Sequence, residues 1–169
     1  RISFALILFA LSFVIWFSKA AGIKTSTSSS SNSSFVTNLV PFLQEINNFH
    51  LPLFSLNKEG YKRIIKLSSL SYLENDELSD PHKDFEELLE DTEGVALFSG
   101  TVFGLFGKLF DKGKFSEIHD MYNKIKSKFN DRFYLEIQRH NDQNELGFEE
   151  FNLKKSLELE IPIIATNEV

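Results

Sequence analysis

The sequence has no cysteine, and it has only one methionine, one tryptophan and four prolines among 169 residues. The absence of cysteine excludes disulfide bonds and thiolate metal sites, and it fits the reducing cytoplasm, where we expect the protein to be located. Basic residues are also few, since 18 lysines and arginines face 24 acidic residues and the net charge is −6. Neutralisation of phosphates supplies most non-specific affinity for DNA, so we expect no direct DNA binding from this acidic chain.

The remaining composition is that of a folded protein. Hydrophobic residues make up 42% of the chain and charged residues 25%, close to the averages for soluble globular domains. The length suits one modest domain with appendages. Three zones of different composition divide the chain, and we predict an apolar N-terminal segment over residues 1–23, a linker region over 24–53 and a folded domain over 54–169.

The first zone contains an uncharged apolar run from Ile2 to Phe17 behind the single basic residue Arg1. The run is shorter than the ~20 residues that a membrane span needs, but it has the length of the hydrophobic region of a signal peptide. Two alternatives remain at this point. The run is a buried segment of the fold, or it is the out-of-frame translation of a damaged reading frame.

The second zone begins with a serine-rich tract, Ile23 to Asn38, which has almost nothing to bury and is typical of a disordered linker. The rest of this zone, up to Leu53, is ambiguous. We make no prediction for its secondary structure.

The third zone shows strand and helix patterns in alternation. We predict helices over 58–73, 84–89, 102–110, 115–129 and 148–160, and strands over 95–98, 133–138 and 162–166. The helix over 115–129 is the most secure, because Phe115, Ile118, Tyr122, Ile125 and Phe129 form one apolar stripe. The strand from Pro162 to Thr166 is continuously apolar, which is typical of a strand buried on both faces of a parallel sheet. Paired acids such as Glu149 and Glu150 are predicted to lie on solvated helix faces.

Alternating strands and helices indicate an α/β fold with a parallel sheet. In such folds the functional residues gather at the carboxyl ends of the strands. This rule places three short segments on one edge of the sheet: Ser99-Gly100, Arg139-His140 and Asn167-Glu168.

Motifs at these strand ends resemble one known family. The segment DRFYLEIQRH (131–140) and the segment EIPIIATNEV (160–169) are very similar to successive segments of the N-terminal PHP (polymerase and histidinol phosphatase) domain of bacterial DNA polymerase III α subunits. Ser99-Gly100 after Gly94 and Gly60-Tyr61 before Lys66-Leu67 match two upstream elements of that domain. The four motifs agree with the family in order and spacing.

The resemblance implies a partial PHP-type distorted β/α barrel. It further implies that the chain is a fragment of a replicative DNA-directed DNA polymerase, a nucleotidyltransferase. The aspartates that hold magnesium for nucleotide transfer lie in the family's palm domain, so this fragment alone is not expected to polymerise DNA, and we assign it no catalytic and no cofactor-binding residue. The partners implied are other replicase subunits, among them the proofreading subunit, and DNA through the full-length protein.

PHP domains can hold divalent metal ions such as zinc, manganese or magnesium for phosphoester hydrolysis. By this resemblance His140 and Glu168 stand at positions of metal ligands and are candidate remnants of the metal site. His140 is otherwise read as an ordinary loop residue, and Glu168 as a solvated acid at a strand end. Metal-binding members carry a glutamate where this sequence has Leu105, and the family's opening His-x-His motif is absent. We therefore expect no metal in this fragment and weigh a metal-free scaffold or interaction module from a degraded gene as the alternative function.

The resemblance fails upstream of Phe54, where a serine tract replaces the expected strand. The chain also starts at Arg1 and stops after an apolar run, which suggests a cut piece or a damaged gene. A barrel that lacks strands exposes sheet edges, so we expect a poorly soluble or partly molten product.

Overall fold

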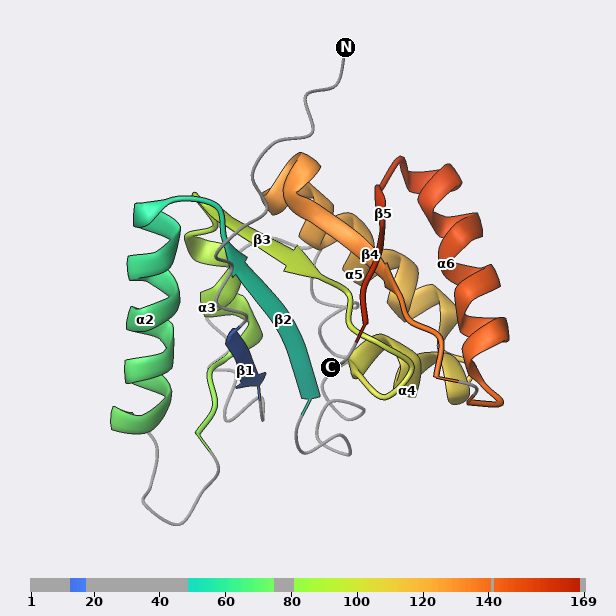
Figure 1. Cartoon of the computed structure of the whole chain (residues 1–169), viewed down its shortest axis with the longest axis horizontal. Helices are drawn as coiled ribbons and strands as arrows, with labels where there is room; N and C mark the ends of the chain where they lie inside the picture. The colour runs from blue at the N-terminus through green and yellow to red at the C-terminus, as the bar shows by residue number, and fades with distance from the viewer. Residues whose placement is uncertain (1–12, 18–48, 75–80, 141, 168–169) are drawn as a thin grey trace, which may run out of the picture.

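The structure is a computed structural model that describes residues 13–17, 49–74, 81–140 and 142–167. Five strands and five helices are present in these residues, with one short 3₁₀ turn (Figure 1). The strands are β1 (Phe13–Phe17), β2 (Phe49–Ser55), β3 (Val95–Phe98), β4 (Phe133–Ile137) and β5 (Ile163–Ala165). The helices are α2 (Lys58–Leu73), α3 (Phe85–Glu90), α4 (Leu105–Asp111), α5 (Phe115–Phe129) and α6 (Glu145–Leu159), and the 3₁₀ turn η1 is Asn130–Arg132.

The strands form one sheet in the order β1-β2-β3-β4-β5. β3, β4 and β5 are parallel, as the alternating pattern predicted, whereas β2 pairs antiparallel with both β1 and β3. The antiparallel pair was not predicted, because residues 49–53 carry no pattern that separates a strand from the ambiguous region before them. Residues 13–17 of the N-terminal apolar run form β1, and the rest of that run lies outside the described residues.

Helix positions agree with the sequence patterns, with two shifted starts. α2, α3 and α5 lie where they were predicted, and the side chain of Asn57 caps α2 by accepting a hydrogen bond of 2.9 Å from the amide of Gly60. α6 begins at Glu145, three residues before the predicted start, and α4 begins at Leu105, three residues after it. No helix in the described part of the chain is long and apolar enough to cross a membrane.

The hydrophobic core lies on the face of the sheet that α4 and α5 cover, behind the strands in Figure 1. Leucines and phenylalanines at alternate strand positions point to this face and are completely buried: Leu51, Leu53, Leu97, Phe133 and Leu135. The apolar stripe of α5 completes the core, with Ile118, Tyr122, Ile125 and Phe129 each 0% exposed. Burial of these side chains is the main source of stability of the described fold.

The opposite face of the sheet has aromatic rings in its middle part and polar side chains near the carboxyl end of β4. Phe54 stacks on Phe98 with ring centroids 4.2 Å apart, and Phe98 meets the ring of Tyr134 at 5.5 Å. Glu136 on β4 and Gln138 just beyond its end occupy the next positions on this face, because side chains of an extended chain alternate between faces. No helix of the described residues covers this side in Figure 1.

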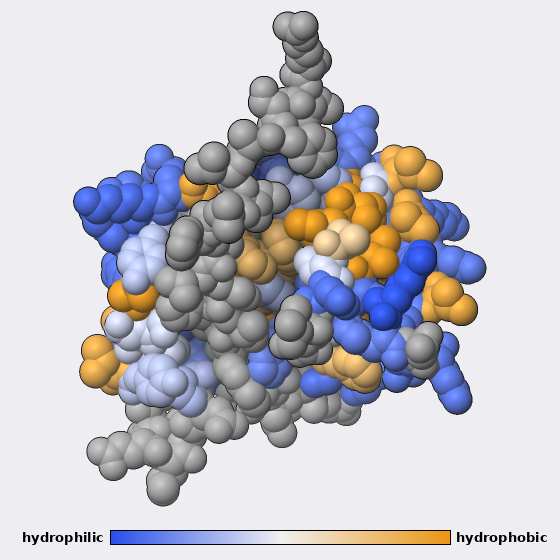
Figure 2. Space-filling view, viewed as in Figure 1, coloured by the Kyte–Doolittle hydropathy of each residue, from blue (hydrophilic) through white to orange (hydrophobic). Residues whose placement is uncertain are grey.

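β5 differs from its prediction as a strand buried on both faces. Ile163 and Ile164 are only half-buried, and Ala165 is exposed. The physical reason is its place at the end of the strand order, where β4 is its one neighbour among the described strands. Figure 2 shows apolar residues gathered over this strand.

Two glycines of the matched motifs contact each other at the start of α2. A Cβ on Gly60 would lie 1.8 Å from the carbonyl oxygen of Gly94, so only glycine permits this approach. Gly94 itself has a positive φ of 71°, a conformation that other residues rarely adopt. The amide of Leu56 donates to the same Gly94 carbonyl at 2.8 Å, and the start of α2 is thereby fixed against the start of β3.

Candidate functional site

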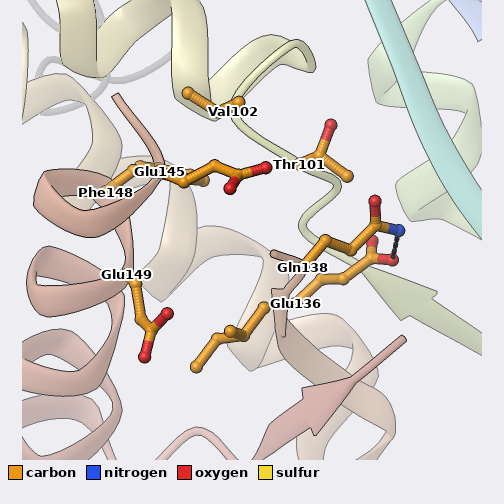
Figure 3. A pocket seen from close by; sticks show the side chains of 8 residues that line it. Thr101, Val102, Glu136, Gln138, Glu145, Phe148 and Glu149 are labelled. Carbon is orange, nitrogen blue, oxygen red and sulfur yellow. Dashed lines mark hydrogen bonds between the residues drawn. The ribbon is translucent and has the colours of Figure 1, made fainter. Parts of the chain in front are cut away.

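The carboxyl ends of β3 and β4 form a recess together with the first turn of α6 (Figure 3). Its walls include Thr101 and Val102 after β3, Glu136 on β4 with Gln138 just after that strand, and Glu145 and Glu149 on α6. β5 runs parallel to β4, and Asn167 follows it on the same edge of the sheet. The predicted gathering of Ser99-Gly100, Arg139-His140 and the residues after β5 is confirmed for the described residues. Glu168 lies outside them.

His140, the first predicted site residue, is held by the carboxylate of Glu145. The backbone amide of His140 donates to both oxygens of Glu145 at 2.8 Å, and the ring nitrogen Nδ1 lies 3.2 Å from Oε1. Burial alone would raise the pKa of Glu145, but the amides of His140 and Asp142 and the imidazole outweigh it and hold that pKa below its ordinary value. Glu145 therefore fixes the loop between β4 and α6 by accepting from backbone amides of that loop, a role that the sequence pattern did not predict.

Arg139 makes a second contact with the same helix, one turn further along. Its Nε and Nη2 donate to the two carboxylate oxygens of Glu149 at 2.9 and 2.6 Å, a paired geometry that suits guanidinium and carboxylate. The hydrogen bonds from Arg139 lower the pKa of Glu149. The prediction of a solvated Glu149 was wrong: its side chain is only 12% exposed, because it lies between Arg139 and the recess.

Gln138, the first residue of the Gln-Arg-His segment, also contacts a glutamate. Its Nε2 donates to Oε1 of Glu136 at 2.9 Å and to the hydroxyl of Thr166 at 2.7 Å, and the Thr166 hydroxyl also donates to Glu136. Glu136 is 5% exposed, yet within the described part of the chain its second oxygen, Oε2, has no hydrogen-bond partner, and neither has Oε1 of Gln138. Each residue of the segment 138–140 thus faces a different glutamate: Glu136, Glu149 or Glu145.

Ser99, the serine of the Ser-Gly motif at the end of β3, forms hydrogen bonds with the backbone of β4. Its hydroxyl accepts a hydrogen bond of 2.9 Å from the amide of Glu136, and its own amide donates to the carbonyl of Tyr134 at 2.9 Å. Gly100 then turns the chain with a φ of 78°. The motif serine therefore joins the ends of β3 and β4 and positions the backbone of Glu136.

Leu105, for which the sequence resemblance predicts a glutamate in metal-binding members of the family, is 0% exposed inside the core. Among the described residues there is also no group of three or more histidine, cysteine, aspartate or glutamate side chains arranged to hold a metal ion. His140 by itself suits a metal ligand, because a carboxylate on one ring nitrogen is the usual support for an imidazole ligand. One supported histidine does not make a multi-metal phosphoesterase centre.

A known protein family matches the part of the chain that contains these strands. The sequence profile of the PHP domain family matches residues 17–140, which is most of the chain. The chain belongs to the PHP domain family. The match includes β2, β3 and β4 and ends at His140, the last residue of the segment that contacts the three glutamates. It begins at Phe17, so it extends upstream of Phe54, where we expected the resemblance to fail.

The similar proteins are bacterial polymerase subunits. DNA polymerase III subunit alpha of Caulobacter vibrioides is 34% identical over 119 residues, which are 70% of this chain and 10% of that protein. The same subunit of Rickettsia felis is 35% identical over 117 residues, 69% of this chain and 10% of the relative. In Borreliella burgdorferi the identity is 34% over 121 residues, 72% of this chain and 10% of the relative. The chain thus spans about a tenth of the length of the curated relatives it matches.

The divalent metals that the family implies do not fit the described residues as a multi-metal centre. The buried Leu105 cannot bind a metal, and His140 has no second histidine or free carboxylate converging on it among the described residues. In the described part of this PHP domain, the parallel strands and their helices are present. The set of ligands that metal-dependent phosphoester hydrolysis requires is not found among these residues.

Proposed function

We propose that this chain is the PHP portion of a replicative DNA polymerase III α subunit and that it acts there as a scaffold without phosphoesterase activity. The identity of about a third to polymerase III α subunits over about 70% of the chain supports the first part. In this proposal the protein is cytoplasmic, its partners are other replicase subunits, including the proofreading subunit, and DNA is bound only by the longer protein. Polymerisation belongs to regions outside this chain.

One observation carries the scaffold role in this proposal: Leu105, which by the resemblance stands where metal-binding members have glutamate, is an apolar side chain completely buried in the core. The hydrogen bonds at the recess fit the same role, because Arg139 and His140 are held by Glu149 and Glu145 on α6. These contacts fix β4 against α6 and leave the strand ends rigid. Glu168 remains a proposed remnant of the ancestral site, together with His140.

A hydrolysis assay tests the scaffold role. The purified chain is incubated with Mn²⁺ or Zn²⁺ and with p-nitrophenyl phosphate or a single-stranded oligonucleotide, and product release is measured. We expect no rate above the protein-free blank, and an identical result for His140→Ala. Metal-dependent hydrolysis that disappears in His140→Ala would show that a working metal centre exists and would refute the scaffold role.

Sequencing the encoding locus tests the parent protein. We expect the reading frame that encodes residues 54–169 to continue into the palm motifs of a polymerase III α subunit. Stop codons or frame shifts on both sides would instead support the alternative of a metal-free scaffold from a degraded gene.

A further inference from the structure

We propose that the chain binds a second copy of itself, with helix α2 of one copy packed antiparallel against helix α6 of the other. The inference goes beyond the scaffold function, because it names a partner and a surface that phosphoester hydrolysis does not involve. The two helix faces concerned carry apolar side chains that are exposed to solvent and do not line the recess.

The outer face of α2 exposes a line of apolar side chains. They are 37–69% exposed and lie on one side of the helix at positions i, i+4 and i+11, namely Tyr61, Ile65 and Tyr72. The opposite side of α2 packs against the sheet, where Ile64 and Ser71 are buried. A contiguous apolar patch on a helix face, unlike a single exposed residue, indicates an interaction surface.

The outer face of α6 exposes a second apolar line. Its side chains are 43–85% exposed and lie at positions i, i+7 and i+11, namely Leu146, Leu153 and Leu157. Phe148 and Asn152, on the inner side of the helix, are buried. Both lines are therefore open to solvent in the described structure.

The spacing of the two lines matches when the helices run in opposite directions. Each line spans 11 residues, about 16 Å along its helix, and the order of its intervals in α2 is the reverse of that in α6. Antiparallel packing then gives three facing pairs: Tyr72 with Leu146, Ile65 with Leu153, and Tyr61 with Leu157. Side chains of matching spacing can interdigitate along the whole contact, as packed helices require.

Charges on the two helices favour this pairing over the pairing of two identical helices. α2 contains four basic residues and one acidic residue, whereas α6 contains four acidic and two basic residues. In the antiparallel alignment the exposed Lys62 falls within two residues of Glu158, and the exposed Lys66 within two residues of Glu150. Lys154 lies between these glutamates, so the flank of α6 remains net negative. Opposite charges across an interface fix its register and partner, so the basic helix face selects the acidic one.

The positions of the two helices in the fold require that the contact joins different copies. α2 packs on β2 and β3, whereas α6 packs on β4, and Figure 1 shows the two helices on opposite sides of the molecule. One copy therefore cannot bring its own α2 and α6 together. The interface is head-to-tail, and each added copy leaves one α2 and one α6 open for the next.

Sedimentation velocity of the whole chain tests the interface, at concentrations from about 10 to 500 µM, a range that includes weak and transient association. We expect the weight-average mass to rise with concentration beyond that of a dimer, because a head-to-tail contact of this kind does not close.

Two substitutions each alter one of the two faces. Ile65→Lys places a charge in the middle of the α2 line, and Leu157→Lys places one on the α6 line. Each is expected to weaken self-association at least about tenfold and to leave the Tm unchanged, since both side chains are exposed. Phe103→Lys alters an exposed apolar side chain on neither helix, and this matched control should associate like the parent chain.

An equimolar mixture of Ile65→Lys and Leu157→Lys tests the pairing of the two faces directly. The first variant keeps an intact α6 and the second keeps an intact α2. The mixture should therefore form a one-to-one dimer and nothing larger. Recovery of the dimer also shows that both variants are folded.

A parent chain that stays monomeric at all these concentrations overturns the second copy as partner. Loss of association in Leu157→Lys but not in Ile65→Lys would indicate that α6 pairs with α6, and it would overturn the role of α2. Unchanged association in both variants, or a mixture of folded variants that remains monomeric, overturns the interface as well. None of these results bears on hydrolysis, so failure of this interface is distinguishable from failure of the scaffold function.

Discussion

At the scale of single residues, the glutamates that line the recess hold neighbouring side chains and backbone amides by hydrogen bonds. Glu145 is the clearest case, because it accepts from two backbone amides and meets the ring of His140. Its pKa is lower in the folded state than in the unfolded chain. Its contribution to stability is therefore fully present above the unfolded pKa, about 4.3, and is lost as pH falls through the folded value.

We expect Glu145→Gln to be less stable than the parent chain at pH 7, and we expect the difference in unfolding free energy to shrink as the pH falls through the lowered pKa of Glu145 in the folded chain. Urea unfolding of both chains across this range measures the difference. Glu150→Gln, an exposed substitution on the same helix, should show no such pH-dependent difference. If the unfolding free energies of Glu145→Gln and the parent differed by the same amount at all pH values, the charge of Glu145 would not be the source of its stabilising effect.

At the scale of elements, two glycines occupy the same position in two helices but differ in their surroundings. Gly60 is the third residue of α2 and Gly147 the third residue of α6. A Cβ at Gly60 would lie 1.8 Å from the backbone of Gly94, whereas at Gly147 the nearest atom is 3.5 Å away, on the ring of Phe110. The first environment forbids a side chain and the second has room for one.

We expect Gly60→Ala to destabilise the fold by about 2–3 kcal/mol, because α2 must move away from the start of β3. Gly147→Ala should instead stabilise it by about 0.5–1 kcal/mol, since alanine has the higher helix propensity. Denaturant unfolding of both variants measures the free energies. Equal effects at the two positions would show that α2 and β3 are not in close contact.

At the scale of the whole molecule, the net charge of −6 opposes binding to nucleic acid. We expect a fluorescein-labelled DNA duplex to show no change in anisotropy up to about 100 µM protein at 150 mM salt, a concentration at which ordinary non-specific binders are saturated or half-saturated. Repeating the titration at 50 mM salt tests for weak electrostatic binding. Saturable binding that weakens with salt would mean that a local basic surface outweighs the net charge.

Local patterns determined much of this protein from the sequence alone. The limits of α2 and the position of α5 are properties of short segments, and the structure confirms them. In the predicted stripe of α5, Ile118, Tyr122, Ile125 and Phe129 are buried, whereas Phe115 is exposed. In β4 the predicted alternation ends at Leu135, because Glu136 is buried and Ile137 is half-buried. Four motifs together, at 60–67, 94–100, 131–140 and 160–169, predicted the PHP family by their order and spacing, and the family match over residues 17–140 confirms it. Ser99, Arg139 and His140 gather at one sheet edge because parallel strands end on the same side.

Only the tertiary structure decided which partner each polar side chain meets. The antiparallel pairing of β2, the partial exposure of β5 and the contacts of Glu145 and Glu149 depend on residues distant in sequence or on the direction of a loop. Glu136 is the strongest example. Its strand position predicted only which face it occupies, whereas its burial beside Thr166, with one oxygen left unpartnered, follows from the pairing of β4 with β5, because that pairing brings two segments 30 residues apart into contact.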